Sequence, residues 1–166
     1  VLRGMHRKYR PWHYREKVEK ISTAMPTAAI GADVMVGFPG ETESDFEDTR
    51  RLIADLPFTY LHVFTYSSRP GTSAAIMREH VPVQIARERN RILRDLAGQK
   101  KLAFMRSFVG KTIDAITLNV FDGTCTEALT DNYLKLRLEG RHAANQWLKV
   151  QVQRVEATAL IAMAET

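Results

Sequence analysis

The feature that most constrains the fold is the run Asp33–Thr42, which reads Asp-Val-Met-Val-Gly-Phe-Pro-Gly-Glu-Thr. It predicts a buried strand that ends abruptly in a Gly-Pro-Gly turn and leads directly into a helix. Residues 29–36 are apolar apart from one glycine and one aspartate, a pattern typical of a strand covered on both faces. Gly37 and Gly40 allow backbone conformations that a side chain would oppose, and Pro39 stiffens the turn between them.

The residues after this turn favour a helix start. Thr42 is a good N-cap, and Asp45 completes a capping-box-like pair with it. Backbone N–H groups at such a helix start point towards whatever binds beyond the strand end. A tight βα turn with a purely structural role explains the same glycines. Asp33, an ionisable group in an apolar strand, is expected to pair with a donor such as Arg69 or to contact a substrate.

A second segment of the same kind follows the first. Amphipathic helices are predicted for residues 11–25 and 43–55, and Tyr60–Tyr66 is a second β-rich run that ends in the turn Ser67–Thr72. Helix, strand, helix and strand at these spacings predict parallel βα units, whose strand ends are where ligands bind. Because two strands cannot close a barrel or complete a sheet, we expect missing chain upstream and interpret the sequence as a fragment.

Basic residues are concentrated in the middle of the chain. The net charge is +5, and residues 78–107 hold eight Lys or Arg against three Asp or Glu. A long helix is predicted from Pro82 to about Ser107. Its apolar stripe is formed by Val83, Ala86, Leu93, Leu96, Ala97 and Phe104, and the rest of its surface carries arginines and lysines, Arg89 among them. Such a helix is equally a solvated connector or a phosphate-contacting surface.

From Gly110 the sequence changes to short β-type runs separated by turns. The predicted strands are residues 111–121, 124–129, 133–138, 147–155 and 158–163. Five short strands in so few residues favour a small closed barrel of the OB-like kind. Aromatic and cationic side chains lie close together here, as single-stranded nucleic acid requires. The alternative is that Tyr133 and Trp147 belong to the core and that the cations are ordinary surface.

The single cysteine, Cys125, excludes an internal disulfide framework and a multi-cysteine metal site. No apolar run approaches the ~20 residues of a membrane span. We therefore expect a cytoplasmic protein with no membrane partner.

Three motifs resemble the C-terminal half of a radical S-adenosylmethionine methylthiotransferase. They are Met5–Tyr9, Asp33–Thr42 and His62–Thr72, in the order and at the spacing typical of the family. The tail from about Phe108 is similar to a TRAM domain, a small β-barrel that holds RNA. Within the family, the run His62-Val63-Phe64 is most similar to the branch that acts on N6-threonylcarbamoyladenosine in tRNA. The isopentenyladenosine branch and, behind it, the branch that modifies a ribosomal protein are the alternatives.

The resemblance implies an α/β fold in which part of a TIM-like (βα) barrel is joined by a long helix to an OB-like TRAM barrel. The implied domains are 1–77 for the barrel part, 78–107 for the basic linking helix and 108–166 for the RNA-binding barrel. It also implies S-adenosylmethionine and two [4Fe–4S] clusters as cofactors, tRNA as partner, and radical chemistry at an adenine ring. Since the chain lacks the family's CxxxCxxC motif, we expect it to be inactive without the N-terminal part of its polypeptide.

Two groups of site residues follow from the motifs. The bare backbone of the glycine turn is expected to form part of the cofactor-site wall, with Arg69 at its mouth able to grip a carboxylate or phosphate. The cofactor-site residues are Gly37, Phe38, Pro39, Gly40, Glu41 and Arg69. The expected RNA-binding residues are Tyr133, Lys135, Arg137, Arg141, Trp147 and Lys149. A free-standing RNA-binding module without catalysis is the alternative function.

Overall fold

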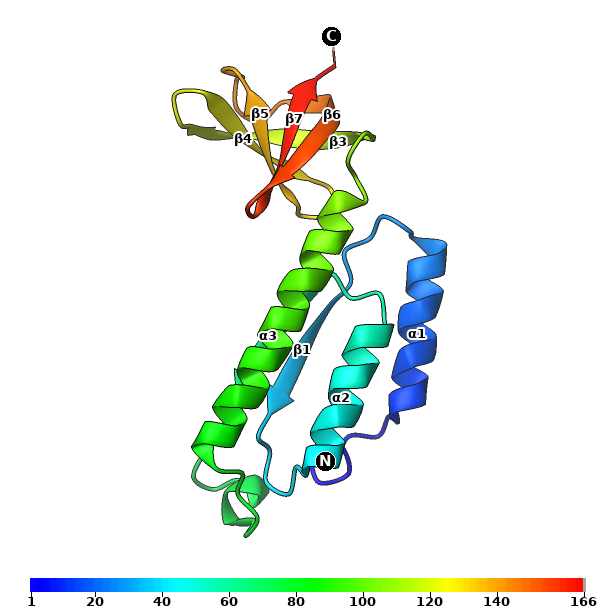
Figure 1. Ribbon diagram of the computed structural model, residues 1–166, viewed down its shortest axis with the longest axis vertical. Helices are drawn as coiled ribbons and strands as arrows, with labels where there is room; N and C mark the ends of the chain where they lie inside the picture. Colours follow the sequence, from blue (N-terminus) through cyan, green and yellow to red (C-terminus); the bar gives the residue numbers. More distant parts are fainter. Residues whose placement is uncertain (166) are drawn as a thin grey trace. The chain divides into compact units, whose positions relative to one another are not determined.

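The structure, a computed structural model, describes residues 1–165. The chain divides into two compact units, one from Val1 to Lys100 and one that begins at Lys101. The first holds a two-stranded sheet with helices packed on one face, and the second holds a five-stranded barrel (Figure 1). The division falls inside the long helix α3, rather than at an end of the helical segment 78–107 that was expected to separate two domains.

The first unit contains two successive helix–strand pairs. In chain order its elements are α1 (Pro11–Ala24), β1 (Gly31–Val36), α2 (Glu43–Asp55), β2 (Tyr60–Thr65), the 3-10 helix η1 (Ser73–Ile76) and α3 (Val83–Arg106). β1 and β2 pair in parallel, from Gly31 opposite Tyr60 to Val36 opposite Thr65. The predicted parallel arrangement is confirmed.

The helix start after the glycine turn also forms as predicted. The Asp45 N–H donates to Thr42 Oγ1 at 3.1 Å, and the Thr42 N–H donates to Asp45 Oδ2 at 2.9 Å. This reciprocal capping box satisfies two N–H groups at the start of α2. The hydroxyl and the N–H of Thr42 both donate to the Asp45 carboxylate. Because these hydrogen bonds favour the charged form, they hold the pKa of Asp45 below its ordinary value.

All three helices contribute to a core on one face of the sheet. The buried members of this core are Val18, Val36, Phe46, Ile53, Leu56, Phe58, Leu61 and Leu93. The opposite face is uncovered: Gly31 and Asp33 are exposed, and Met35 is half-buried. The prediction of a strand covered on both faces is therefore wrong for this chain, because the helices lie on the face formed by Ala32 and Val34.

The helix α3 departs from its predicted pattern at two positions. Ala86 and Leu93 are buried as expected, but Val83, which was assigned to the apolar stripe, is exposed. Arg89, which was assigned to the solvent side with the other arginines, is buried. Its burial follows from helical spacing, since Arg89 lies three residues after Ala86 and four before Leu93 and so shares their face.

The second unit begins with the end of α3 and is otherwise built from β-strands. Its strands are β3 (Thr112–Phe121), β4 (Cys125–Thr130), β5 (Lys135–Glu139), β6 (Trp147–Glu156) and β7 (Ala159–Ala164), each within two residues of its predicted bounds. The order β3-β4-β5-β7-β6 closes because β3 also pairs with β6. Of the described strand pairs in this barrel, β5–β7 is parallel and the others are antiparallel. The interior holds alternating side chains of each strand, with Leu136, Leu138, Val150 and Leu160 fully buried.

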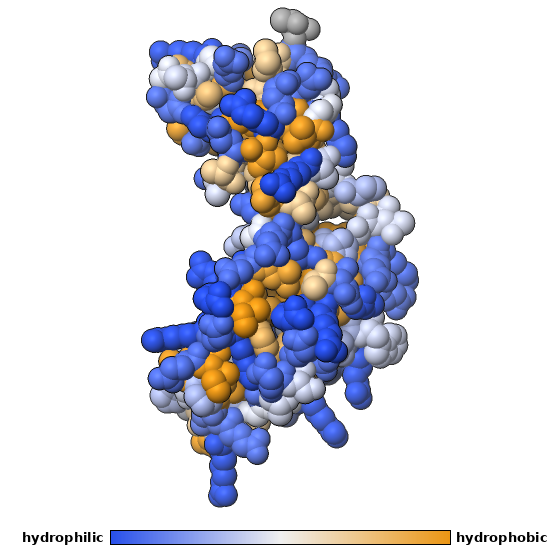
Figure 2. Space-filling model, viewed as in Figure 1, coloured by the Kyte–Doolittle hydropathy of each residue, from blue (hydrophilic) through white to orange (hydrophobic). Residues whose placement is uncertain are grey.

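The surface of both units is mixed. On the face drawn in Figure 2, hydrophilic side chains surround small apolar patches on each unit. Between residues 1 and 165, no helix is both long and apolar enough to cross a membrane.

Candidate functional site

The glycine turn after β1 is held by its own backbone and by one carboxylate. Gly37 and Gly40 have φ of 77° and 81°, the left-handed region that favours glycine. The Gly37 N–H donates to Glu41 Oε2 at 2.5 Å, and the Glu41 N–H donates to the Phe38 carbonyl at 2.9 Å. The Gly40 N–H donates to the Glu79 carbonyl at 2.7 Å. The turn is therefore closed on itself and tied to the segment before α3.

Glu41 forms a buried ion pair with Arg89 of α3. Arg89 Nη1 donates to Glu41 Oε2 at 2.9 Å and to the Glu41 carbonyl at 3.1 Å. The two side chains are only 6% and 4% exposed. Since the same Oε2 accepts from Gly37, one carboxylate oxygen joins the turn to the helix. The Glu41 carboxylate is therefore bound inside the protein, and the expected place of Glu41 on a cofactor-site wall stays a prediction.

Other groups complete the surroundings of Arg89. Its Nη2 donates to Glu43 Oε2 at 2.9 Å, and its guanidinium lies 5.3 Å from the centroid of the Phe46 ring. Burial alone would lower the pKa of Arg89, but the hydrogen bonds to Glu43 and Glu41 raise it above its ordinary value. Its Nε is buried with no hydrogen-bond partner among residues 1–165.

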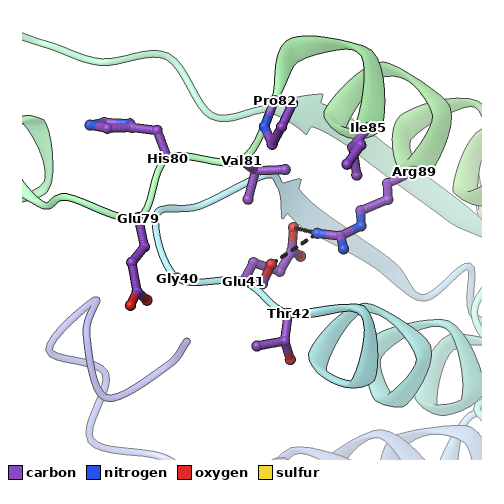
Figure 3. A pocket seen from close by; sticks show the side chains of 9 residues that line it. All are labelled: Gly40, Glu41, Thr42, Glu79, His80, Val81, Pro82, Ile85 and Arg89. Carbon is purple, nitrogen blue, oxygen red and sulfur yellow. Dashed lines mark hydrogen bonds and ion pairs between the residues drawn. The ribbon is translucent and has the colours of Figure 1, made fainter.

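A small open cavity lies beside this pair. Its volume is about 230 Å³, and its walls come from the glycine turn, the start of α2 and the segment that leads into α3 (Figure 3). The lining residues are Gly40, Glu41, Thr42, Glu79, His80, Val81, Pro82, Ile85 and Arg89. Figure 3 shows the Glu41 carboxylate turned towards Arg89. The cavity wall includes apolar side chains, such as Val81 and Ile85, as well as charged ones.

The structure brings together some of the expected cofactor-site residues. Phe38 is buried and meets the Tyr66 ring edge-on at 5.4 Å between centroids, so the ends of β1 and β2 are in contact. The hydroxyl of Tyr66 is buried without a partner in the described chain, which fits a group that covers this end of the sheet. Gly37 and Pro39 are also buried, and Gly40 is half-buried.

Arg69 belongs to the turn that follows β2. It is exposed in the second turn, where its carbonyl accepts from the N–H and hydroxyl of Thr72. None of the ion pairs within residues 1–165 joins it to Asp33, which is itself exposed and needs no buried partner. The expected Asp33–Arg69 pair is therefore wrong.

The described residues do not fit an iron–sulfur cluster. Cys125 is the only cysteine and belongs to β4, and no cluster of three or more His, Cys, Asp or Glu residues suited to a metal ion occurs within residues 1–165. Cluster ligation needs several thiolates together, so the chain does not supply it.

The barrel carries exposed aromatic rings. Tyr133 is 81% exposed in the β4–β5 turn, and Trp147 is 65% exposed at the start of β6. The alternative that places these rings in the core is wrong. Trp147 lies opposite Ile116, Ile116 opposite Leu129, and Leu129 opposite Lys135, across β6, β3, β4 and β5. We call the outward-facing residues Trp147, Ile116, Leu129 and Lys135 the Trp147 row.

Four of the expected RNA-binding residues are cations, and the two arginines among them have partners within the barrel. Arg137 is bound to Asp122, which raises the pKa of Arg137, and lies 3.9 Å from Glu156. The guanidinium of Arg141 is placed 5.5 Å from the centroid of the Phe121 ring. Lys135 and Lys149 are exposed, on β5 and β6. The lysines are therefore better placed than Arg137 to meet a phosphate.

Three buried threonines, which sequence reasoning missed, fix the loops of the barrel. Thr117 Oγ1 donates to the Ala143 carbonyl at 2.6 Å and accepts from the Gln146 N–H at 2.9 Å, next to Trp147. Thr126 Oγ1 accepts from the His142 N–H, next to Arg141. Thr130 Oγ1 accepts from the Leu134 N–H, next to Tyr133. Their alternation with apolar core residues along β3 and β4 was the available signal.

Replacing Thr117 by valine is expected to lower the free energy of unfolding by about 1–3 kcal/mol, because the Gln146 N–H then loses its buried acceptor. Chemical denaturation measures the change. Thr112→Val is the control, since the exposed Thr112 hydroxyl bonds only to Glu165 among the contacts in the described chain. Equal stabilities of the two variants would contradict the role given to Thr117.

Comparison with known proteins gives relatives along most of the chain. A threonylcarbamoyladenosine tRNA methylthiotransferase of Aquifex aeolicus is 34% identical over 92% of this chain and 36% of its own length. A tRNA-2-methylthio-N(6)-dimethylallyladenosine synthase of Nocardia farcinica is 43% identical over 70% of the chain and 23% of its length. The corresponding synthase of Endomicrobium trichonymphae is 35% identical over 85% and 34%.

No protein-family model matches the chain. The chain spans about a quarter to a third of the length of these relatives. Identity at this level over most of the chain, together with the motifs at the ends of β1 and β2, establishes homology. The chain belongs to the radical S-adenosylmethionine methylthiotransferase family.

Proposed function

We propose that the chain is the C-terminal part of an enzyme that adds a methylthio group to a modified adenosine of tRNA. The observation that carries the proposal is the homology to tRNA methylthiotransferases over most of the chain. The fold supports it, because a glycine turn at the ends of parallel strands and a barrel with exposed aromatic rings occur in one chain.

Each unit has its own part in this proposal. Unit 1 is part of a larger TIM-like (βα) barrel, which is consistent with the uncovered face and free edges of its two-stranded sheet. The five-stranded barrel of the second unit is proposed to be an OB-like TRAM domain. Its closure and its parallel β5–β7 pairing support this proposal. The partners are tRNA and the preceding part of the same polypeptide, which would supply the cluster ligands.

The cofactor site is proposed to include the glycine turn. S-adenosylmethionine, when bound with a [4Fe–4S] cluster, supplies the radical chemistry. This chain's own contribution is backbone at Gly37 and Gly40 and the aromatic contact of Phe38, which shape one wall. Arg69 is proposed to meet a carboxylate or phosphate at the mouth.

Replacing Gly40 by valine in the full-length polypeptide is expected to weaken S-adenosylmethionine binding at least tenfold, which is about 1.4 kcal/mol. A β-branched residue at φ 81° strains the backbone of the turn. The cause is not a steric clash, since the nearest atom to an added Cβ is Glu79 Oε2 at 3.6 Å. Equilibrium dialysis on the cluster-loaded protein measures the affinity. Wild-type affinity in this variant would remove the turn from the cofactor site.

The RNA surface is proposed to be the Trp147 row with Lys149 and Tyr133. Trp147→Ala in the full-length polypeptide is expected to weaken tRNA binding by about 1–3 kcal/mol, since a stacked base loses its aromatic partner. Trp12→Ala is the matched control, because Trp12 is 62% exposed but lies in the other unit. Filter binding gives both affinities, and equal losses would contradict the assignment.

The modified nucleoside is proposed to be N6-threonylcarbamoyladenosine. The Aquifex relative named for this nucleoside matches 92% of the chain, against 85% and 70% for the Endomicrobium and Nocardia relatives named for dimethylallyladenosine, which reach higher identity over their shorter stretches. Nucleoside mass spectrometry of tRNA, after the full-length gene is expressed in cells without either activity, separates the two branches. The 166-residue chain alone is expected to produce neither product.

A further inference from the structure

The cluster formed by Gly37, Glu41, Ala86 and Arg89, which we call the turn clamp, joins the glycine turn to α3 at two points. The first is steric: a Cβ added at Gly37 would lie 2.7 Å from the Cβ of Ala86. The second is electrostatic, because Arg89 donates to Glu41 Oε2, the same oxygen that accepts from the Gly37 N–H. Ala86 and Arg89 are one helical turn apart, so α3 presents both to the turn.

We infer that Arg89 is a positioning residue, which fixes the conformation of the Gly37–Glu41 turn and thereby the affinity for the cofactor that the turn is proposed to contact. The inference rests on the proposed function. Arg89 does not itself reach the cofactor, because its guanidinium is taken up by Glu41, Glu43 and the Phe46 ring. It acts through the carboxylate of Glu41.

The contacts explain why a charge is needed at this position. Glu41 is buried, and burying a carboxylate without a partner is costly, so its side chain would turn towards water once Arg89 is removed. The Gly37 N–H then loses its acceptor, and Gly37 is free to leave its left-handed conformation. Arg89 also holds the Glu41 carbonyl, so both ends of the residue are fixed by one guanidinium.

Helix α3 offers a matched control two residues away. Arg91 is exposed and pairs with Glu88 at 2.6 Å and Asp95 at 2.9 Å on its own helix. Arg91→Met makes the same chemical change on the same helix as Arg89→Met, but leaves the turn clamp intact. A difference between the two variants therefore reports the clamp and not the loss of helix charge.

The experiment uses the cluster-loaded full-length polypeptide with Arg89→Met, Arg89→Lys or Arg91→Met. We expect Arg89→Met to raise the dissociation constant for S-adenosylmethionine at least tenfold at full binding stoichiometry, measured well below the melting temperature. Arg89→Lys restores part of the affinity, since an ammonium group still pairs with Glu41 but cannot also hold the carbonyl. The Gly37 amide is expected to exchange with solvent at least tenfold faster in Arg89→Met alone.

The outcomes separate a positioning role from a structural one. A lower melting temperature with unchanged affinity and unchanged Gly37 exchange would overturn the inference, because the pair would then only stabilise the fold. Faster exchange with unchanged affinity would also overturn it, by showing that the turn moves without consequence for the cofactor. If the wild-type protein binds no S-adenosylmethionine, the proposed function itself fails, and with it the cofactor role of Arg89.

Discussion

Replacing Gly37 by alanine is expected to lower the free energy of unfolding by about 2–5 kcal/mol, which combines backbone strain and overpacking. The backbone part arises because Gly37 has φ of 77°, where any residue with a Cβ is strained. The packing part arises because the new Cβ meets Ala86 Cβ at 2.7 Å, on a helix that is itself held by Arg89. Chemical denaturation of the protein measures the loss.

A second glycine separates these two contributions. Gly71 has φ of 82°, but an added Cβ would meet no atom within 4 Å. Gly71→Ala is therefore expected to lose only the backbone part, about 1–2 kcal/mol. Adding Ala86→Gly to Gly37→Ala should recover most of the packing part, because the two Cβ atoms no longer meet. Equal losses in Gly37→Ala and Gly71→Ala would contradict the close approach of α3 to the turn.

The local chemistry of the turn was sufficient to predict its conformation. Two glycines, a proline and the Thr42–Asp45 pair each act within a few residues, so no distant contact was needed to place the strand end and the helix start. The strands of the barrel were predictable for the same reason, because alternation and turn residues are local signals.

The surroundings of the turn were harder to predict, because they depend on contacts between distant segments. An apolar strand indicates burial but does not show which covering layers this chain supplies, and so Asp33 was placed in the wrong environment. Arg89 was overlooked because its charge suggested solvent, although its spacing from Ala86 and Leu93 put it on the buried face. Its partner Glu41 is 48 residues away in the sequence.

The exposure of Trp147 and Tyr133 was left open by the sequence because aromatic residues suit both a barrel core and a stacking surface. The structure resolves the choice through the strand alternation. Val150 and Val152 of β6 point inward. Trp147 and Lys149 lie at the alternate positions and are exposed, so Trp147 faces outward beside Ile116. The core is instead filled by aliphatic side chains.

Replacing Leu138 by alanine is expected to lower the free energy of unfolding of the barrel by about 2–5 kcal/mol, the range for emptying a fully buried leucine site. Leu138 is 0% exposed and lies between Thr126 of β4 and Ala162 of β7. Neither neighbour is large enough to fill the space, so the cavity should persist. The fluorescence of Trp147 in a Trp12→Phe background reports unfolding of this unit alone.

Leu129→Ala removes the same atoms from the outer face of the barrel. Leu129 is half-buried in the Trp147 row, between Ile116 and Lys135, so its truncation exposes little new cavity surface and should cost less than half as much stability. It should nevertheless weaken tRNA binding, because it interrupts the apolar strip beside Trp147, whereas the folded fraction of Leu138→Ala should bind tRNA with wild-type affinity. The reverse result, with stability lost at Leu129 and affinity lost at Leu138, would show that the inner and outer faces of the barrel had been assigned the wrong way round.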